Sequence, residues 1–347
     1  MSLESLQQRI RDAAQRRAPL RLRGGGSKDF YGNEPRGEIL DTRGYAGIVS
    51  YEPTELVLTA RCGTPLAEVE GLLHENRQML AFEPPHFGPG ATFGGCIAAG
   101  LSGPRRAAAG ALRDFVLGAK LVDGRGRAVS FGGQVMKNVA GYDIARLAAG
   151  SLGTLALIAE ASVKVLPLPP VELTLQREAT QAGALEAMNR WAGQPLPVSA
   201  SAWHEGVLRV RLSGAAAAVR AAAQKIGGEA LDDAGGFWAG MREQSHPFFA
   251  GGEPLWRLAL PSTCPALALA GSTLVEWGGG LRWLKSAADP REAARRAGGH
   301  ATLFRAARKD GGAFTPLDPV LERLHRALKA AFDPAGILNP GRMYAEI

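Results

Sequence analysis

Three consecutive glycines follow a short strand near the start of the chain, in R-L-R-G-G-G-S-K-D-F-Y-G (residues 21–32). A Walker loop would need G-K followed by Ser or Thr at the start of a helix, whereas the order here is G-S-K. A Rossmann fingerprint would need its last glycine inside a helix, whereas the residues after Asp29 read as a loop. What remains is a run of backbone N–H groups that could surround a diphosphate, with Arg23 and Lys28 adding positive potential. The alternative is a plain surface turn.

Two further glycine-rich segments lie in the first half, at residues 88–103 and 150–158. In the first of them, Thr92 is placed to cap a helix whose opening residues include Gly, Cys, Ile and Ala. Such small side chains let another helix or a large flat ligand press against the backbone. Three loops spread over so long a stretch favour one extended ligand with a diphosphate and two ends, for which FAD is the obvious candidate.

The elements that would position these loops are both helices and strands. The first half is predicted to contain helices at 3–10, 64–73 and 94–99 and strands at 20–23, 39–40, 48–51, 55–60, 116–122, 128–131 and 155–165. The adjacent Pro169 and Pro170 mark a boundary. The second half is predicted to contain strands near 171–177, 198–203, 207–212, 256–260, 272–277 and 301–305 and helices near 181–192, 215–226, 236–244, 263–270, 290–297 and 319–332. Its loosely repeated strand–helix–strand–strand–helix order resembles ferredoxin-like α+β units.

The composition limits the functions to consider. The chain has 347 residues, enough for two domains, and its 45 glycines are well above the typical share of roughly 7%. Its formal charge of +7 is not concentrated in a basic run that interleaves with aromatics, so nucleic acid is not an expected partner. The three cysteines stand far apart, which excludes a disulfide scaffold, a cysteine zinc site and a ferredoxin-type iron–sulfur cluster within this chain. With neither a signal-peptide core nor an integral membrane segment in view, a cytoplasmic protein is expected.

Several motifs together form a recognisable pattern. They are R-G-G-G-S, T-F-G-G-C-I-A-A-G-L-S-G-P-R-R, G-A-L-R-D-F-V-L-G, K-N-V-A-G-Y-D-I-A-R-L, G-S-L-G-T-L-A-L-I and F-D-P-A-G-I-L-N-P-G-R-M. With them the chain resembles the FAD-binding family of the vanillyl-alcohol oxidase/PCMH type, and within it the smaller flavin subunits of bacterial glycolate oxidase complexes. The resemblance is dense in the first half and patchy in the second.

The resemblance implies an α+β fold. Residues 1–168 would form a PCMH-type FAD-binding domain of two α+β subdomains. Residues 169–318 would form a ferredoxin-like cap domain on the substrate side. Residues 319–347 would form a helix and tail that return to the FAD-binding domain.

The resemblance also implies, by motif matching, which residues hold the cofactor. Relatives that attach flavin covalently use a histidine in or near the first loop, or a cysteine at another site. No histidine lies between Arg23 and Asp41, so non-covalent FAD is expected. The residues expected to bind it are Arg23, Gly24, Gly25, Gly26, Ser27, Lys28 and Asp29 around the diphosphate, Pro85, Gly90, Ala91, Thr92, Gly94, Gly95, Ala99, Ser102 and Gly103 along the cofactor, and Gly150, Gly153, Thr154, Leu155 and Ile158 near the isoalloxazine ring.

Oxidation of a 2-hydroxy acid by hydride transfer to flavin needs an acceptor for the hydroxyl proton and a cation that clamps the carboxylate. His300, just before a strand that carries Arg305, is the histidine expected to face the flavin. The alternatives are a structural histidine and a solvated arginine. No metal-binding set of histidines is visible. A polar cluster of undecided role, structural or catalytic, is formed by Lys137, Asn138, Tyr142 and Asp143.

Two functions stay open at this point. The first is an FAD-dependent subunit of a glycolate oxidase-type complex, which oxidises glycolate or a similar 2-hydroxy acid to the 2-oxo acid. Its electrons would pass to partners, namely a larger flavin subunit and an iron–sulfur subunit, which could hold the chain at the inner face of the membrane. The second is a non-catalytic flavin-holding or scaffolding subunit, which the missing metal histidines favour. A cofactor-free basic adaptor is a weaker third alternative.

Overall fold

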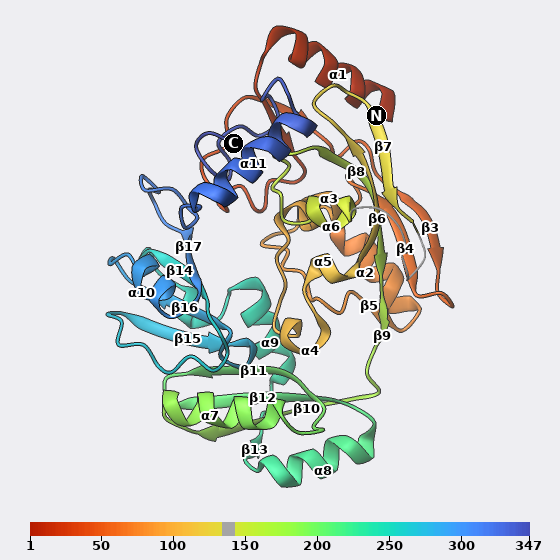
Figure 1. The fold of residues 1–347 in the computed structure, drawn as a ribbon. Helices are drawn as coiled ribbons and strands as arrows, with labels where there is room; N and C mark the ends of the chain where they lie inside the picture. The colour runs from red at the N-terminus through yellow and green to blue at the C-terminus, as the bar shows by residue number, and fades with distance from the viewer. Residues whose placement is uncertain (134–142) are drawn as a thin grey trace.

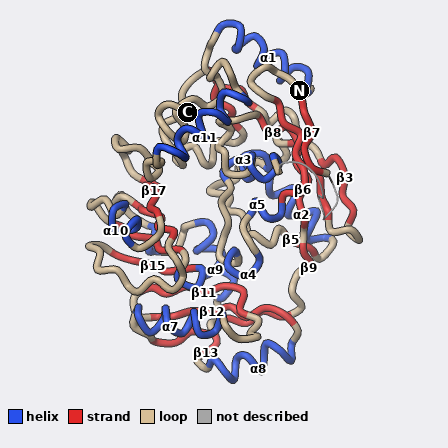
Figure 2. Tube along the Cα trace, in the orientation of Figure 1, coloured by secondary structure: helices blue, strands red, loops and turns tan. Residues whose placement is uncertain are grey.

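The computed structural model describes residues 1–133 and 143–347, and its two large β-sheets, one in each half of the chain, lie on either side of a central region (Figure 1). Three residues of the predicted polar cluster, Lys137, Asn138 and Tyr142, fall outside the described residues. Loops run through much of the central region (Figure 2). Binding residues usually lie on loops that a rigid scaffold holds in place, so a ligand-binding site is expected in this central region.

The first half contains a five-stranded sheet covered by helices. In chain order its elements are α1 (Leu3–Arg16), β1 (Leu20–Arg23), β2 (Glu38–Asp41), β3 (Ile48–Glu52), β4 (Val57–Arg61), α2 (Leu66–Glu75), β5 (Gln78–Met79), α3 (Phe93–Ala99), α4 (Arg106–Ala109), α5 (Leu112–Phe115), β6 (Val116–Val122), β7 (Ala128–Gly132), α6 (Ile144–Ala148), β8 (Leu157–Lys164) and β9 (Leu166–Pro167). The sheet runs β3-β4-β8-β6-β7, and β1 and β2 form a separate parallel pair.

The central strand β8 is buried on both faces of this sheet. On one face, α2, α3, α5 and α6 pack into a core that includes the fully buried Phe82 and Phe93. On the other, Leu6 and Ile10 of α1 are fully buried at helical spacing and pack against Leu157. Because α3 is thus fixed against the sheet, the glycine-rich segment that contains it has a defined position.

The second half contains an eight-stranded antiparallel sheet. In chain order its elements are β10 (Val171–Glu178), α7 (Gln181–Ala192), β11 (Val198–His204), β12 (Val207–Gly214), α8 (Ala216–Ile226), β13 (Glu229–Ala230), α9 (Ala234–Glu243), a 3-10 turn (Pro247–Phe249), β14 (Leu255–Ala259), β15 (Ser272–Glu276), a 3-10 turn (Trp277–Gly279), β16 (Leu281–Lys285), α10 (Arg291–Arg296), β17 (His300–Arg305) and α11 (Pro319–Phe332). The strand order is β13-β10-β12-β11-β15-β16-β14-β17.

This sheet is made of two ferredoxin-like units placed side by side. The elements β10, α7, β11, β12, α8 and β13 follow one another as β-α-β-β-α-β, with β10 and β12 in the middle of their four strands. The strands β14 to β17 repeat that strand order, with α10 as the only helix among them. The cap is therefore ferredoxin-like, as the sequence predicts.

The helix predicted near residues 263–270 is wrong, because this segment is a loop between β14 and β15. Pro265 stands in its first turn and disfavours the helical conformation of Cys264 before it. Arg282 of β16 donates instead to the carbonyl oxygens of Cys264 and Pro265, the latter at 2.6 Å. Trp283 and Arg282 are both buried, so this part of β16 belongs to the core.

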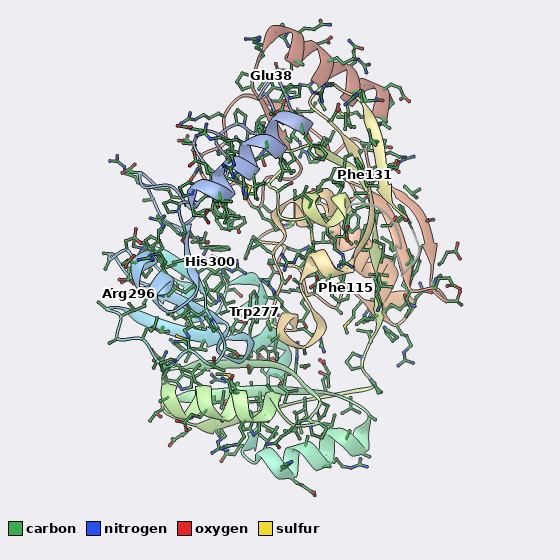
Figure 3. The ribbon with its side chains drawn as sticks, in the orientation of Figure 1. Glu38, Phe115, Phe131, Trp277, Arg296 and His300 are labelled. Atoms are coloured by element: carbon green, nitrogen blue, oxygen red, sulfur yellow. The ribbon has the colours of Figure 1, made fainter. Side chains whose placement is uncertain are left out.

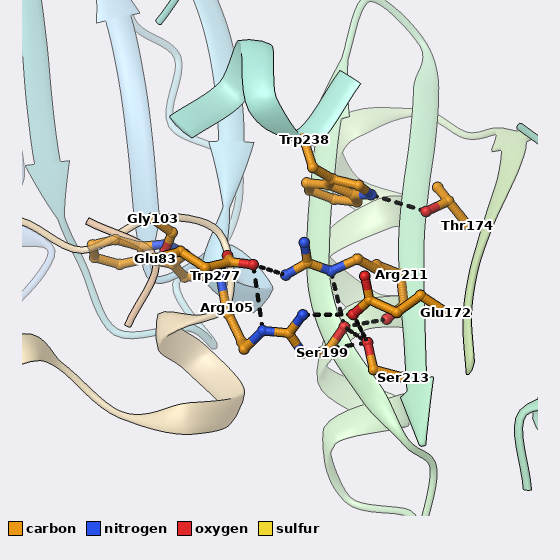
Figure 4. A network of polar contacts seen from close by, with 10 residues as sticks. All are labelled: Glu83, Gly103, Arg105, Glu172, Thr174, Ser199, Arg211, Ser213, Trp238 and Trp277. Carbon is orange, nitrogen blue, oxygen red and sulfur yellow. Dashed lines mark hydrogen bonds and ion pairs between the residues drawn. The ribbon is translucent and has the colours of Figure 1, made fainter. Parts of the chain in front are cut away.

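A network of buried charges joins the two halves (Figure 4). Glu83, in the loop after β5, accepts from Arg211 Nη2 of β12 at 2.8 Å and from Arg105 Nε at 3.3 Å. Arg105 also pairs with Glu172 of β10 at 2.5 Å. Both arginines are at most 7% exposed. Nearby, the indole Nε1 of Trp277 donates to the Gly103 carbonyl at 3.0 Å, so the loop before α4 is fixed to the cap at several points.

The boundary predicted at Pro169 and Pro170 falls between the elements of the two halves, since β9 ends at Pro167 and β10 begins at Val171. The domain bounds 1–168, 169–318 and 319–347 follow this division, and we keep them as a proposal. Within residues 1–133 and 143–347, every helix is too short or too polar to cross a membrane.

Candidate functional site

The glycine run after β1, the start of α3 and the loop before β8 meet at one cavity of about 90 Å³. The C-terminal tail completes its wall. Residues that line the cavity include Arg21, Arg23, Gly24, Gly25, Gly26, Ser27, Lys28, Asp29, Thr92, Gly95, Ala99, Leu152, Asn339 and Arg342. The three segments predicted to converge are thus in contact with one another.

Two close backbone approaches explain why these loops consist of glycine. A Cβ on Gly25 would lie 1.5 Å from the carbonyl oxygen of Gly90, which joins the first segment to the second. A Cβ on Gly100 would lie 2.7 Å from the Cα of Gly150, which joins the second segment to the third. Any side chain at Gly25 or Gly100 would therefore force two loops apart.

The glycine run offers a series of unused hydrogen-bond donors. The backbone N–H groups of Gly24, Gly25, Gly26, Ser27 and Lys28 donate to no acceptor among the described residues. Backbone donors in a folded protein are nearly always paired, with protein, water or ligand. Five consecutive free N–H groups beside a cavity form a nest suited to the oxygens of a phosphate.

The charged side chains around this cavity also favour an anionic ligand. Four basic side chains line it, from Arg21, Arg23, Lys28 and Arg342, against the single carboxylate of Asp29. Arg21 and Arg23 both pair with Asp29, Arg23 Nε at 2.9 Å. Burial lowers the pKa of Lys28, and it lowers the pKa of Arg342 to about 10, because each charged head lacks full solvation. An anionic diphosphate would relieve this positive excess.

Two residues of the tail, Asn339 and Arg342, belong to the site although sequence reasoning missed them. Asn339 Oδ1 accepts from the N–H of Leu22 at 2.8 Å, and its Nδ2 donates to the Leu152 carbonyl at 2.6 Å. Arg342 Nη2 donates to the Asp29 carbonyl at 2.9 Å. The polar residues of the L-N-P-G-R-M motif were the available signal. Through these hydrogen bonds Asn339 and Arg342 fix the strand before the glycine run and the residue at its end.

A second cavity of about 60 Å³ adjoins the first and shares Arg23, Gly24 and Gly95 with it. Its far end is less polar, with Cys62 and Ile158 in the lining. Burial raises the pKa of the Cys62 thiol to about 12, so it stays neutral. Together the two cavities form an elongated site, charged in one part and apolar in another, which fits the diphosphate and one end of a dinucleotide.

A third cavity, of about 20 Å³, lies where the first half faces the cap. Pro85, Ser102 and Gly103 line it from the first half, and Arg257 of β14 and Glu276 of β15 line it from the cap. It is therefore bounded on one side by residues that the sequence predicts to bind the cofactor and on the other by charged residues of the cap.

The structure places the predicted cofactor residues in two groups. The predicted residues that line one of these three cavities are Arg23, Gly24, Gly25, Gly26, Ser27, Lys28, Asp29, Pro85, Thr92, Gly94, Gly95, Ala99, Ser102, Gly103, Gly153 and Ile158. Those that lie beside the cavities without lining them are Gly90, Ala91, Gly150, Thr154 and Leu155. The role of each residue in binding remains a prediction.

His300 and Arg305 stand at opposite ends of β17, about 17 Å apart along the strand, so they cannot hold one small substrate together. Neither lines the three cavities. His300 is an exposed residue at the start of β17 (Figure 3), and desolvation of its ring together with Arg257 and Arg106 lowers its pKa. Arg305 donates to Gln244 at 3.0 Å. Their catalytic roles stay predictions. No cluster of His, Cys, Asp or Glu in the described part of the chain could hold a metal ion.

The protonation of Glu276 should make the free energy of unfolding depend on pH. It is 3% exposed, and burial raises its pKa from 4.5 to about 7. Because the folded state holds this proton more tightly, its stabilising effect is present below about pH 4.5 and is lost as pH rises through 7. Glu276→Gln should therefore raise the free energy of unfolding at pH 8.5 by up to about 3 kcal/mol and change it little at pH 4.5. Urea unfolding at both pH values measures this.

The matched control is Glu253→Gln, because Glu253 is an exposed carboxylate that pairs with Lys285 at 3.2 Å. Its unfolding free energy should follow the wild-type pH dependence. A Glu276→Gln variant with an unchanged pH dependence would show that this carboxyl titrates normally.

The fold and the matches to known proteins define a flavoprotein of the FAD-linked oxidase class. Residues 1–132 match the profile described as an FAD binding domain, and residues 315–343 match the profile described as the C-terminal domain of FAD linked oxidases. Among solved structures, the chain is similar to an alkyldihydroxyacetonephosphate synthase, with a TM-score of 0.67 and 16% identity over 97% of this chain and 75% of that one. It is also similar to 6-hydroxy-D-nicotine oxidase from Arthrobacter nicotinovorans, with a TM-score of 0.63 and 16% identity over 99% of this chain and 90% of that one.

Among curated proteins, the chain is 48% identical to the glycolate oxidase subunit GlcE of Escherichia coli (strain K12), over 99% of this chain and 98% of the relative. It is 32% identical to a D-lactate dehydrogenase of Archaeoglobus fulgidus, over 46% of this chain and 35% of that enzyme. The chain therefore belongs to the GlcE family of glycolate oxidase subunits, and its cofactor is FAD.

Proposed function

We propose that this chain is the FAD-bearing subunit of a complex that oxidises glycolate or a similar 2-hydroxy acid to the 2-oxo acid. The observation that carries the proposal is the nest of five unused N–H groups among four basic side chains, in a chain of the GlcE family. FAD, when bound, supplies the oxidant for such a reaction. The chain's own residues bind its diphosphate through the glycine run and hold that run in place through Asn339 and Arg342.

The cofactor is proposed to be bound without a covalent link. Cys62 and Cys96, the two cysteines of the first half, are buried in separate cores. Burial raises the pKa of the Cys96 thiol to about 12, which keeps it unreactive. His86, in the segment between β5 and α3, is engaged with Glu70 at 2.8 Å. The surroundings of the glycine run thus favour reversible binding.

The partners we propose are a larger flavin subunit and an iron–sulfur subunit, through which the chain would lie at the cytoplasmic face of the membrane. The first turns of α11 support a protein contact, because Val320, Leu321 and Leu324 are 55%, 44% and 51% exposed. Apolar side chains that gather on one exposed helix face often mark such a contact.

Two measurements test this proposal. The purified full chain should be yellow, and acid precipitation should leave FAD in the supernatant with a colourless pellet. The chain co-purified with its partners should reduce a dye when glycolate is added. A colourless chain that takes up no FAD in a titration would contradict the cofactor assignment, and an inert complex would contradict the substrate class.

A second function is favoured by one observation. The cavity between Ser102 and Glu276 measures about 20 Å³, which accommodates about one water molecule. A flavin-holding subunit whose larger sibling carries the chemistry would need no more space. Anaerobic addition of glycolate to the isolated chain separates the two functions, since flavin bleaching occurs only if this chain is itself catalytic.

A further inference from the structure

The small cavity between the two halves contains the charged groups that a 2-hydroxy acid requires. Its first-half wall is the loop of Ser102 and Gly103, which we propose to lie along the cofactor. Its cap wall includes Arg257 and Glu276, on strands that are both paired with β16. A cation and a carboxyl group thus share one cavity with residues that are predicted to bind the cofactor.

The cation side of the cavity shares it with the Glu276 carboxyl but forms no direct ion pair with it in the described part of the chain. The guanidinium groups of Arg257 and Arg106 lie 5.3 and 4.5 Å from the ring centroid of Trp277. In the described part of the chain, neither forms an ion pair or a side-chain hydrogen bond. Burial and the charge of Arg257 lower the pKa of Arg106 to about 10. A half-buried arginine whose hydrogen-bond donors are unused is suited to bind the carboxylate of a ligand.

Glu276 is held in one orientation with one oxygen unused. Its Oε2 accepts from the indole Nε1 of Trp283 at 2.8 Å, and its Oε1 accepts no hydrogen bond from the described residues. Because the indole does not titrate in the physiological range, this bond fixes the carboxyl in either protonation state. Arg257 and Arg242, which line the cavity, and Glu83 are the charged groups that face it.

Space for a substrate depends on Arg242. This side chain lines the 20 Å³ cavity and also an outer cavity of about 420 Å³, which Trp238 and Arg211 line as well. Arg242 Nε is tied only to the neighbouring Glu243, at 2.9 Å, among the described residues. Rotation of its guanidinium toward the outer cavity would open the inner one.

We propose that this cavity is the 2-hydroxy-acid site, in which Arg257 clamps the substrate carboxylate and Glu276 accepts the hydroxyl proton. The inference rests on the proposed function and assigns the reaction to this chain. Bound FAD would supply the oxidant that accepts the C–H electron pair as hydride, and the O–H proton would go to Glu276. A 2-oxo acid and a neutral Glu276 carboxyl remain, so atoms and electrons balance.

The test uses the full FAD-loaded chain and two readouts. Oxalate, which carries carboxylates but no C–H bond, is titrated while the visible spectrum of the flavin is followed. Glycolate is then mixed anaerobically, and the rate of flavin bleaching is measured from pH 5.5 to 8.5. The variants are Arg257→Met and Glu276→Gln, with Arg209→Met as control, because Arg209 also lies over an aromatic ring, that of Phe237 at 4.7 Å, outside the cavity.

Arg257→Met should weaken oxalate binding at least tenfold, whereas Arg209→Met should change it less than twofold. Glu276→Gln should keep oxalate binding, slow bleaching about 100-fold and abolish the wild-type increase in rate between pH 6 and 8. Glu276→Asp, which restores a carboxylate, should recover the pH dependence.

Three results would overturn the proposal. One is a wild-type chain that is yellow but whose spectrum responds to neither oxalate nor glycolate; the flavin-holding function would then stand while the substrate site fails. The second is unchanged oxalate binding in Arg257→Met. The third is a slow Glu276→Gln variant with the wild-type pH profile, which would show that Glu276 acts only through structure.

Discussion

Gly25→Ala should lose at least 100-fold in FAD affinity and be purified colourless. The new Cβ would lie 1.5 Å from the carbonyl oxygen of Gly90, far inside van der Waals contact. Because the Cβ is bonded directly to the Cα of residue 25 and the oxygen belongs to the backbone, neither can move without shifting the glycine run or the segment before α3. The five free N–H groups would then no longer converge on the diphosphate. Flavin fluorescence in a titration of the apoprotein measures the affinity, and circular dichroism checks that the variant folds.

The control for this variant is Gly71→Ala in the middle of α2. A Cβ there would meet no atom within 4 Å, and alanine is the better helix former. Gly71→Ala should bind FAD as the wild type does and be slightly more stable. If Gly25→Ala retained wild-type affinity, the glycine run would not be the diphosphate site.

Glu83→Gln should lower the free energy of unfolding by about 3–5 kcal/mol, because it removes the carboxylate that two buried arginines share. The side chains of Arg105 and Arg211 are only 8% and 6% exposed, and Glu172 would be left as their one anionic partner in the network. Since Arg105 follows the loop of Ser102 and Gly103, we expect FAD affinity to fall as well. Urea unfolding followed by tryptophan fluorescence gives the free energy.

The matched control is Glu292→Gln, which breaks ion pairs with Arg295 and Arg296 on the surface of α10. All three side chains are more than half exposed, so the free energy of unfolding should hardly change. A loss of similar size in both variants would mean that the network between the halves contributes no more than a surface ion pair.

The features that the sequence predicts well are the local ones. The glycine run is visible because no other residue type permits such close backbone approach, and α7, α8 and the strands of the first ferredoxin-like unit follow clear hydrophobic periodicity. The helix predicted at 263–270 fails because its apolar spacing competes with Pro265, and the carbonyls that it would pair internally are taken by Arg282.

The features that sequence reasoning misses depend on contacts distant in the chain. Asn339 forms hydrogen bonds with Leu22 and Leu152, and no local sequence pattern indicates a partner more than 180 residues away. Likewise, Glu276 and Arg257 look like ordinary strand residues, since burial and the meeting of β14, β15 and the Ser102 loop are what make them unusual. A site made by the approach of two domains is therefore invisible until both are folded.

The contacts of the C-terminal residues Asn339 and Arg342 with the start of the chain affect the order of events during synthesis. The glycine run leaves the ribosome early, yet the side chains of Asn339 and Arg342 that brace it emerge more than 300 residues later. A nascent chain therefore has an unbraced nest for most of its synthesis. FAD should therefore bind only after the chain is released from the ribosome. Chains truncated before residue 339 should contain no bound FAD.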